Sequence, residues 1–303
     1  MVLFIMNGIA ANNNVKTLNI NKKLKGSNLR DAIGKTVITL ILFAFSLVMV
    51  LPFIWMISTS MKYEVDVFTY PIQWIPAKFR IIENYREVWF GDAPFTLYYF
   101  NSIKVTVITT VLSLLISSMA AFAFSKLKFP GRDKIFLLII ATMIIPDQVT
   151  LIPRFLYFKW LHLFDTHICL IISMLFSQSN IFFITQFMKS LPAELSDSAK
   201  IDGAGTFRTF WNIILPLTKP AIATMAIIKF IWSWNDYQNV LIFITNAKLF
   251  TIQIGVRMFT DKYGSFYSLI MAASVSAIIP LFIVFALGQK YIIEGLTAGS
   301  VKG

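Results

Sequence analysis

The stretch from Leu191 to Ala221 reads LPAELSDSAKIDGAGTFRTFWNIILPLTKPA and lies between two apolar runs of membrane length. Its first half, Ala193 to Asp202, has the composition of a short polar helix. Gly203 and Gly205 supply the permissive backbone that ends such a helix. The pattern therefore predicts a short surface helix, a glycine turn and a second helix.

The second helix is expected to begin at Thr206, whose hydroxyl makes it a suitable N-cap. Apolar residues then recur with helical spacing, which predicts an amphipathic helix. The apolar stripe consists of Phe207, Phe210, Trp211 and Ile214. Pro216 and Pro220 bend the chain into the next apolar run. A compact elbow that is rigidly joined to a membrane span suits the transmission of force; an ordinary loop between spans is the alternative.

The composition indicates an integral membrane protein. The chain has 303 residues, of which 57% are hydrophobic and 14% charged, and its mean hydropathy is +0.70. Apolar runs of about 20 residues can cross the hydrocarbon core. Six such runs predict an all-α fold with six transmembrane helices: Thr36–Ser58, Val105–Phe124, Ile135–Tyr157, Ile168–Phe187, Ala221–Ile244 and Leu269–Gly288. Pro146, Asp147, Gln148 and Arg154 interrupt the third run.

The distribution of Lys and Arg predicts the orientation. If the N-terminus is inside, the segments that face the cytoplasm carry more Lys and Arg than the segments that face outward. Because positive residues favour the cytoplasmic side, both termini and the elbow are expected in the cytoplasm. The net charge of +12 then faces anionic lipid headgroups, and no nucleic-acid partner is expected. The expected organisation is a cytoplasmic tail (1–35), a first helix (36–58), an extracytoplasmic segment (59–99), a five-helix core (100–289, with a cytoplasmic coupling loop at 189–219) and a cytoplasmic tail (290–303).

The order of residues in the elbow resembles a loop shared by the permease subunits of ATP-binding-cassette (ABC) importers. The family pattern is roughly E-A-A-x-I-D-G-A followed by I-x-L-P, and this chain departs from it with Asp197 and Ser198 in the first two positions. Further short motifs are similar to the sugar-importing branch, close to the second permease of maltose-type systems. They are Leu51-Pro52-Phe53, Trp55-Met56, Ser58-Thr59-Ser60, Asn101-Ser102, Ile152-Pro153, Trp234-Asn235-Asp236 and Glu294 to Gly299.

This resemblance implies a type I ABC importer permease fold (MetI-like) and a carbohydrate importer driven by ATP hydrolysis on partner subunits. The implied partners are a second homologous permease, a cytoplasmic ABC ATPase dimer and an extracytoplasmic solute-binding protein. The implied ATPase-coupling residues are Glu194, Asp197, Ser198, Ala199, Ile201, Asp202, Gly203, Ala204, Leu215 and Pro216. We expect this chain to bind no cofactor of its own, with ATP and Mg²⁺ held by the ATPase. Gly34-Lys35-Thr36 does not complete a phosphate-binding loop, because position 29 is Leu rather than Gly.

Polar residues at membrane depth are costly and usually face a cavity or a protein contact. On a continuous fifth helix Lys229, Ser233 and Asp236 would share one face. Candidate residues of a translocation path are Gln148, Gln178, Asn180, Lys229, Ser233, Asn235 and Asp236; contact with a partner subunit is the alternative for the face of the fifth helix.

Three other classes of function are weaker. An ion-coupled secondary transporter needs intramembrane carboxylates, for which Asp147 and Asp236 are the candidates. His162, Asp165 and His167 have no specific metal-ligand spacing, so no metal site is expected. No arrangement of reactive side chains indicates an enzyme.

Overall fold

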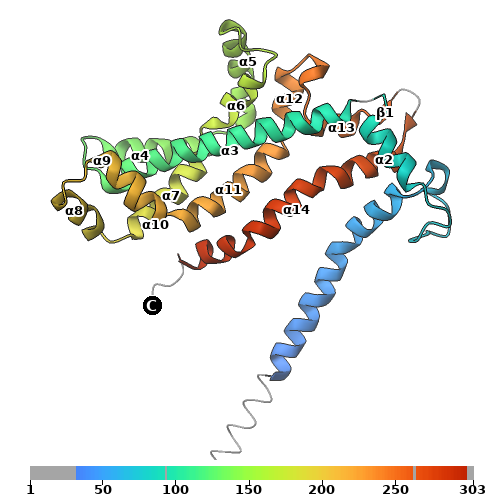
Figure 1. The fold of residues 1–303 in the computed structure, drawn as a ribbon, viewed down its shortest axis with the longest axis horizontal. Coiled ribbons are helices and arrows are strands. Elements are labelled where there is room, and N and C mark those ends of the chain that lie inside the picture. The colour runs from blue at the N-terminus through green and yellow to red at the C-terminus, as the bar shows by residue number, and fades with distance from the viewer. Residues whose placement is uncertain (1–31, 93, 262–263, 299–303) are drawn as a thin grey trace, which may run out of the picture. The chain divides into compact units, whose positions relative to one another are not determined.

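The computed structural model describes residues 32–92, 94–261 and 264–298 (Figure 1). Most of the predicted N-terminal tail and the end of the C-terminal tail lie outside these residues. The chain divides into two units, Met1–Met56 and Ile57–Gly303. The first unit contributes most of a helix that runs from Ala32 to Ser60, which includes the predicted first span. The most apolar stretch of this helix, 18 residues long, has no buried residue, so its apolar side chains are available to lipid.

The second unit is helical apart from one short antiparallel ladder, β1 (Thr260–Asp261) with β2 (Gly264–Ser265). Its α-helices are α2 (Ile81–Phe90), α3 (Phe95–Lys126), α4 (Arg132–Ala141), α5 (Leu151–Trp160), α6 (His167–Leu175), α7 (Gln178–Ser190), α8 (Glu194–Ile201), α9 (Thr206–Thr209), α10 (Leu215–Leu217), α11 (Lys219–Trp234), α12 (Gln238–Phe243), α13 (Ile252–Arg257) and α14 (Tyr267–Ala298). Shorter 3₁₀ turns cover Glu64–Asp66, Thr142–Ile144, Asp147–Thr150 and Ala247–Leu249, and a π-helical turn covers Phe210–Ile214. The predicted all-α class is confirmed.

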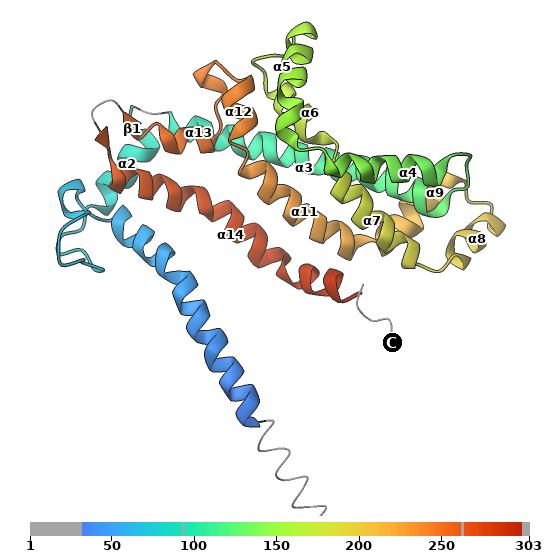
Figure 2. The same ribbon diagram turned by 180° about the vertical axis from the view of Figure 1, so that it is seen from behind.

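The long helix α3 is the centre of this unit. It packs against α6, α7 and α11, and α11 in turn packs against α14 (Figures 1 and 2). Small hydroxyl residues make close helix contact possible. The buried ones on α3 are Ser102, Thr106, Thr109, Thr110, Ser113, Ser117 and Ser118. They explain why a helix without a strongly apolar face can be the core of the bundle.

Among the residues that the structure describes, three helices by themselves are long and apolar enough to span a membrane, and the number rises to six if each of three bent pairs forms one span. The third run bends by 97° between Arg132–Ile144 and Asp147–Trp160, at the interruption predicted from Pro146. The fourth run was predicted as one helix, Ile168–Phe187, but it bends by 43° after Leu175. The hydroxyl of Ser177 accepts a hydrogen bond from the Asn180 backbone N–H and starts a new helix there.

The prediction of a continuous fifth helix, Ala221–Ile244, is wrong. Helix α11 ends at Trp234, and the chain turns at Asn235. The next helix, α12, begins at Gln238. In its first turn, the backbone and side-chain nitrogens of Asn239 donate hydrogen bonds to the Asp236 carboxylate. The run is apolar enough for one helix, but Asn and Asp side chains compete for backbone donors and favour a helix boundary.

The segment after the first helix is attached to the bundle through polar contacts. Asn84, on α2, is fully buried, and its amide donates to the carbonyls of Ser60 and Lys62 at 3.0 and 2.8 Å. The Glu64 carboxylate accepts hydrogen bonds from the backbone N–H groups of Tyr267 and Ser268 at 2.9 and 2.8 Å. Glu64 therefore caps the N-terminus of α14.

Candidate functional site

The candidate site is the elbow formed by α8, α9 and α10. At the end of α8 the N–H of Gly203 donates to the Lys200 carbonyl at 3.0 Å, and that of Ala204 to the Ala199 carbonyl at 2.8 Å. This pair of bonds is the Schellman arrangement, which requires a left-handed residue after the helix. Gly203 supplies it with φ +75°. The sequence thus predicted the turn correctly, although α9 begins at Thr206 with Gly205 as its N-cap.

Helix α8 turns only a small face toward the rest of the protein. Ser196 and Ala199 are its buried residues. The remaining predicted coupling residues on α8 and its C-cap are exposed: Glu194, Asp197, Ser198, Ile201 and Asp202. Ile201 is 87% exposed, although it is aliphatic. The exposed surface therefore combines carboxylates with one aliphatic side chain.

The buried side of α8 faces the end of α3 across a cavity and contacts the π-helical turn Phe210–Ile214. Lys126 donates from Nζ to the Leu191 carbonyl at 2.7 Å, which holds the entry to the elbow against α3. A cavity of about 270 Å³ lies beneath α8, and Ser196 lines it together with Lys126 and Thr209. Within the described part of the chain, the Ser196 hydroxyl has no hydrogen-bond partner. Helix α8 is thus fixed at its ends and less tightly packed under its middle.

The second half of the elbow connects α8 to α11. Phe210 and Ile214 are buried, whereas Phe207 is 67% and Trp211 38% exposed, so only half of the predicted apolar stripe enters the core. The Phe210 ring lies 5.3 Å from that of Phe122 on α3. Thr206–Leu217 meets Lys219–Trp234 at 76°. The remaining predicted coupling residues of this half, Leu215 and Pro216, line an apolar groove of about 440 Å³.

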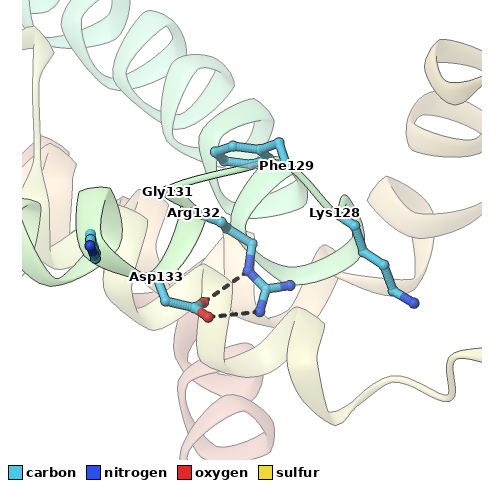
Figure 3. Close-up of a pocket in the computed structure, with 6 residues that line it drawn as sticks. Lys128, Phe129, Gly131, Arg132 and Asp133 are labelled. Carbon is cyan, nitrogen blue, oxygen red and sulfur yellow. Dashed lines mark hydrogen bonds and ion pairs between the residues drawn. The ribbon is translucent and has the colours of Figure 1, made fainter.

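A further cavity, of about 470 Å³, lies at the turn between α3 and α4 (Figure 3). Lys128 and Arg132 line it, but the Arg132 guanidinium is paired with Asp133 at 2.8 Å. Figure 3 shows the Lys128 side chain extending away from this pair. The cavity is therefore basic and open, and it lies outside the elbow.

Some of the predicted path residues lie beside an ionic network. Gln148 is exposed and follows Asp147, whose carboxylate pairs with Arg154 at 3.1 Å. The Arg154 guanidinium also lies 6.0 Å from the ring centroid of Phe243 on α12. Asn235 is exposed, and its amide oxygen accepts a hydrogen bond from Gln253 at 3.3 Å. The structure thus brings the break of the third run close to the end of the fifth.

The other predicted path residues lie deeper. Gln178 is half-buried, and Asn180, Lys229 and Ser233 are buried. The Lys229 ammonium donates to the backbone carbonyl of Met174 at 2.5 Å. Asp236 does not continue the face of Lys229 and Ser233, because α11 ends at Trp234. The expectation of one polar face carrying all three residues is therefore wrong.

His167 and Asp165 hold a neighbouring loop. His167 Nε2 is hydrogen-bonded to the Leu249 carbonyl at 2.9 Å. Asp165 Oδ1 accepts from the backbone N–H groups of Thr245 and Asn246 at 2.8 and 2.9 Å. His167 and Asp165 thus support the loop before α13.

Sequence reasoning missed four residues of this arrangement. Lys126, Arg154 and Gln253 make the contacts given above, and Met174 acts through a backbone carbonyl, which no side-chain pattern reveals. The signal for Arg154 was present, because a charge inside an apolar run needs a partner.

Comparisons with known proteins agree with this architecture. Residues 113–297 match the model of a family described as "Binding-protein-dependent transport system inner membrane component". The arabinooligosaccharides transport system permease protein AraQ of Bacillus subtilis is 33% identical over 90% of this chain and 97% of its own length. A putative ABC transporter permease protein of Caldicellulosiruptor sp. is 38% identical over 86% of this chain and 95% of its own length.

The crystal structure of a bacterial ABC transporter involved in the import of the acidic polysaccharide alginate contains a similar chain. The two chains superpose with a TM-score of 0.77 and 26% identity, over 86% of this chain and 97% of the other. The family match covers α4 to α13 and most of α14, and it therefore includes the whole elbow. This chain belongs to the family of binding-protein-dependent transport system inner membrane components.

Proposed function

We propose that this chain is the permease subunit of an ABC importer that, together with a second homologous permease, forms the transmembrane path for a carbohydrate. Transport is driven by ATP hydrolysis on a cytoplasmic ATPase dimer, and an extracytoplasmic solute-binding protein delivers the solute. The observation that carries the proposal is the match to importer permeases over nearly the full length of both chains, with the elbow included.

The relatives support a saccharide as the solute class. One is named for the transport of arabinooligosaccharides, and the transporter of the similar crystal structure is involved in alginate import, so both concern chains of sugar units. Sugars are recognised by hydrogen-bonding side chains, and exposed amides at the ends of broken helices suit such contacts. Gln148 and Asn235 are exposed polar residues of this kind.

We assign the coupling to the ATPase to α8. Its exposed carboxylates and Ile201 form the surface that enters a cleft on the ATPase, and the glycine turn at Gly203 fixes the angle of the following helix. Closure of the ATPase dimer then moves α8, and α9 to α11 pass that motion into the membrane as a rigid-body change. The exposure of α8 supports this role.

We assign the wall of the path to Gln148, Gln178, Asn235 and Asp236, supported from behind by the buried residues Asn180, Lys229 and Ser233. This side of the chain would face the second permease. The proposed location is the inner (cytoplasmic) membrane, with both termini and α8 on the cytoplasmic side, as the positive charges indicate.

The test is uptake by the purified complex. The chain is tagged, and the subunits that co-purify with it are reconstituted into liposomes with their solute-binding protein. Radiolabelled arabinotriose and a radiolabelled alginate trisaccharide serve as probes, after the solutes named for the relatives. We expect uptake of at least one probe that requires both ATP on the ATPase side and the binding protein.

An ion-coupled transporter would behave differently. Uptake that persists without ATP and collapses with a protonophore would support that alternative, in which Asp147 or Asp236 carries the ion. Substitution of the catalytic glutamate in the ATPase subunit is the matched control, because it should abolish uptake only in the ABC mechanism.

A further inference from the structure

We propose that Lys229 is a positioning residue that ties α11 to the end of α6, so that α6, α7 and α11 move with α8 as one rigid lever. The hydrogen bond from its ammonium to the Met174 carbonyl closes the end of this lever that lies away from the elbow. This role rests on the proposed function, because it requires that the ATPase moves α8.

At the end near the elbow, the chain itself connects α7 to α11. Helix α7 ends at Ser190, just before α8, and α11 begins at Lys219, just after α10. Helices α7 and α11 pack against each other, and the elbow joins them (Figure 1). A displacement of α8 therefore acts on both helices at once.

At the end away from the elbow, Lys229 connects α11 to the end of α6. Helix α6 ends at Leu175, and the fourth run bends by 43° before α7 begins. Carbonyls in the last turn of a helix lack intrahelical partners, so the Met174 oxygen is available at this bend. Lys229 is 8% exposed and reaches it at 2.5 Å from a position 55 residues along the chain.

The two groups satisfy each other. A buried ammonium is costly in a membrane unless it finds an acceptor, and a helix break leaves a carbonyl without a donor. The hydrogen bond gives the ammonium one acceptor and gives the carbonyl a donor, and it needs no acidic residue. Removal of the Lys229 ammonium would leave the Met174 carbonyl without this donor, so the contact opposes separation of α11 from the bend.

The mechanical consequence is specific. With the bond intact, a motion of α11 carries the end of α6 with it, so the bend at Phe176 and Ser177 moves together with α8. Without the bond, α11 can shift while α6 remains in place. The coupling helix would still move with the ATPase, but the bend would not follow, and hydrolysis would no longer be matched by transport.

The test compares Lys229→Met with Lys229→Arg in the assembled, reconstituted complex. The Met side chain retains the apolar stem and loses the donor, whereas Arg retains a charged donor. Lys104→Met, at an exposed position on α3, is the matched control for the loss of a lysine. The readout is the number of probe sugars taken up per ATP hydrolysed. We expect a fall of roughly tenfold for Lys229→Met, and values near wild type for Lys229→Arg and Lys104→Met.

A second readout follows the bend directly. Phe176 is exposed, and the chain has a single natural cysteine, Cys169. A Phe176→Cys, Cys169→Ala chain is labelled with a maleimide with and without ATP. The labelling rate should change with ATP in the parent and stay constant once Lys229→Met is added, although the ATPase subunits remain bound and active.

An unchanged transport ratio in an assembled Lys229→Met complex would overturn the proposal. Loss of assembly in Lys229→Met, and equally in Lys229→Gln, which retains a donor, would make Lys229 a folding element and also overturn it. Failure of the proposed function looks different, because the wild-type complex itself would then show no ATP-dependent uptake.

Discussion

Gly203 and Gly205 lie two residues apart in the elbow, and a Cβ atom placed on either would meet nothing within 4 Å. Their backbones nevertheless differ, since φ is +75° at Gly203 and −67° at Gly205. Space therefore does not explain the first glycine. The left-handed conformation that ends α8 explains it. Substitutions at Gly203 and Gly205 therefore distinguish a backbone effect from a packing effect.

This difference predicts the behaviour of the coupling loop. Gly203→Ala should cost roughly 1–2 kcal/mol of local strain, and Gly203→Pro should also remove the N–H that bonds to Lys200. We expect Gly203→Pro to abolish uptake while ATP hydrolysis by the complex continues. Gly205→Ala is the matched control and should transport normally; a normally transporting Gly203→Pro complex would contradict the coupling assignment.

A second prediction concerns the apolar residue of the exposed surface of α8. Ile201 is 87% exposed, and an aspartate there would place a charge in the contact with the ATPase. Ile201→Asp should reduce co-purification of the ATPase by roughly tenfold. Lys200→Gln removes an exposed ion pair to Asp197 on the same helix and should have little effect. Equal recovery of the ATPase with both variants would place its contact elsewhere.

The sequence was sufficient for elements that depend on local chemistry. Membrane-length apolar runs predicted the helices, Pro146 predicted the sharpest bend, and Gly203 predicted the end of α8. It failed where a polar side chain redirects an apolar run. Ser177 caps α7, and the Asp236 carboxylate accepts hydrogen bonds from Asn239 in the first turn of α12. In the sequence, both residues look like polar residues inside a continuous span.

The partner of Lys229 could not be predicted for a related reason. Its acceptor is a backbone carbonyl that becomes available only because α6 ends at Leu175. Charge patterns suggested Asp236 as a residue of the same face, and the break after Trp234 removed that relation. Contacts to backbone groups at helix breaks depend on tertiary structure, so residue types alone do not encode them.

A third prediction tests the cap on α14. Glu64 accepts bonds from Tyr267 and Ser268, and loss of such a cap costs about 1 kcal/mol. Glu64→Ala should lower the apparent melting temperature of the purified chain by ~2–4 °C, with a smaller fall for Glu64→Gln. Glu87→Ala, at an exposed position on α2, is the control. Equal melting temperatures for Glu64→Ala and wild type would show that the cap contributes no stability.

A fourth prediction concerns the acid sensitivity of the loop before α13. Hydrogen bonds from the backbone N–H groups of Asn246 and then Thr245 lower the pKa of the Asp165 carboxyl below its ordinary 3.8, against the opposing effect of burial. A lowered pKa means that the stabilisation is present above the ordinary value and is lost as pH falls through the lowered one. Amide hydrogen exchange at Thr245 and Asn246 should be slower in the wild-type chain than in an Asp165→Asn chain at neutral pH. In strong acid the two chains should exchange at equal rates. A difference between the two chains that did not change with pH would contradict this assignment.

The last prediction is the orientation in the membrane, which decides whether α8 can reach a cytoplasmic ATPase at all. Cysteine labelling from outside intact cells is the measurement, in a Cys169→Ala background. The position must be chosen from the structure, because Ser196 is 8% exposed and would resist labelling on either side of the membrane. Ser198 is exposed on the same helix, and Tyr70, 96% exposed, lies in the segment expected outside.

An impermeant maleimide should therefore label Tyr70→Cys in intact cells and Ser198→Cys only after the membrane is opened. Labelling of both positions after permeabilisation controls for reactivity. The opposite pattern, with Ser198→Cys labelled in intact cells, would put α8 on the outer face. The positive charges around the elbow would then lie on the side where they are least favoured, and its exposed surface would need a partner other than an ATPase.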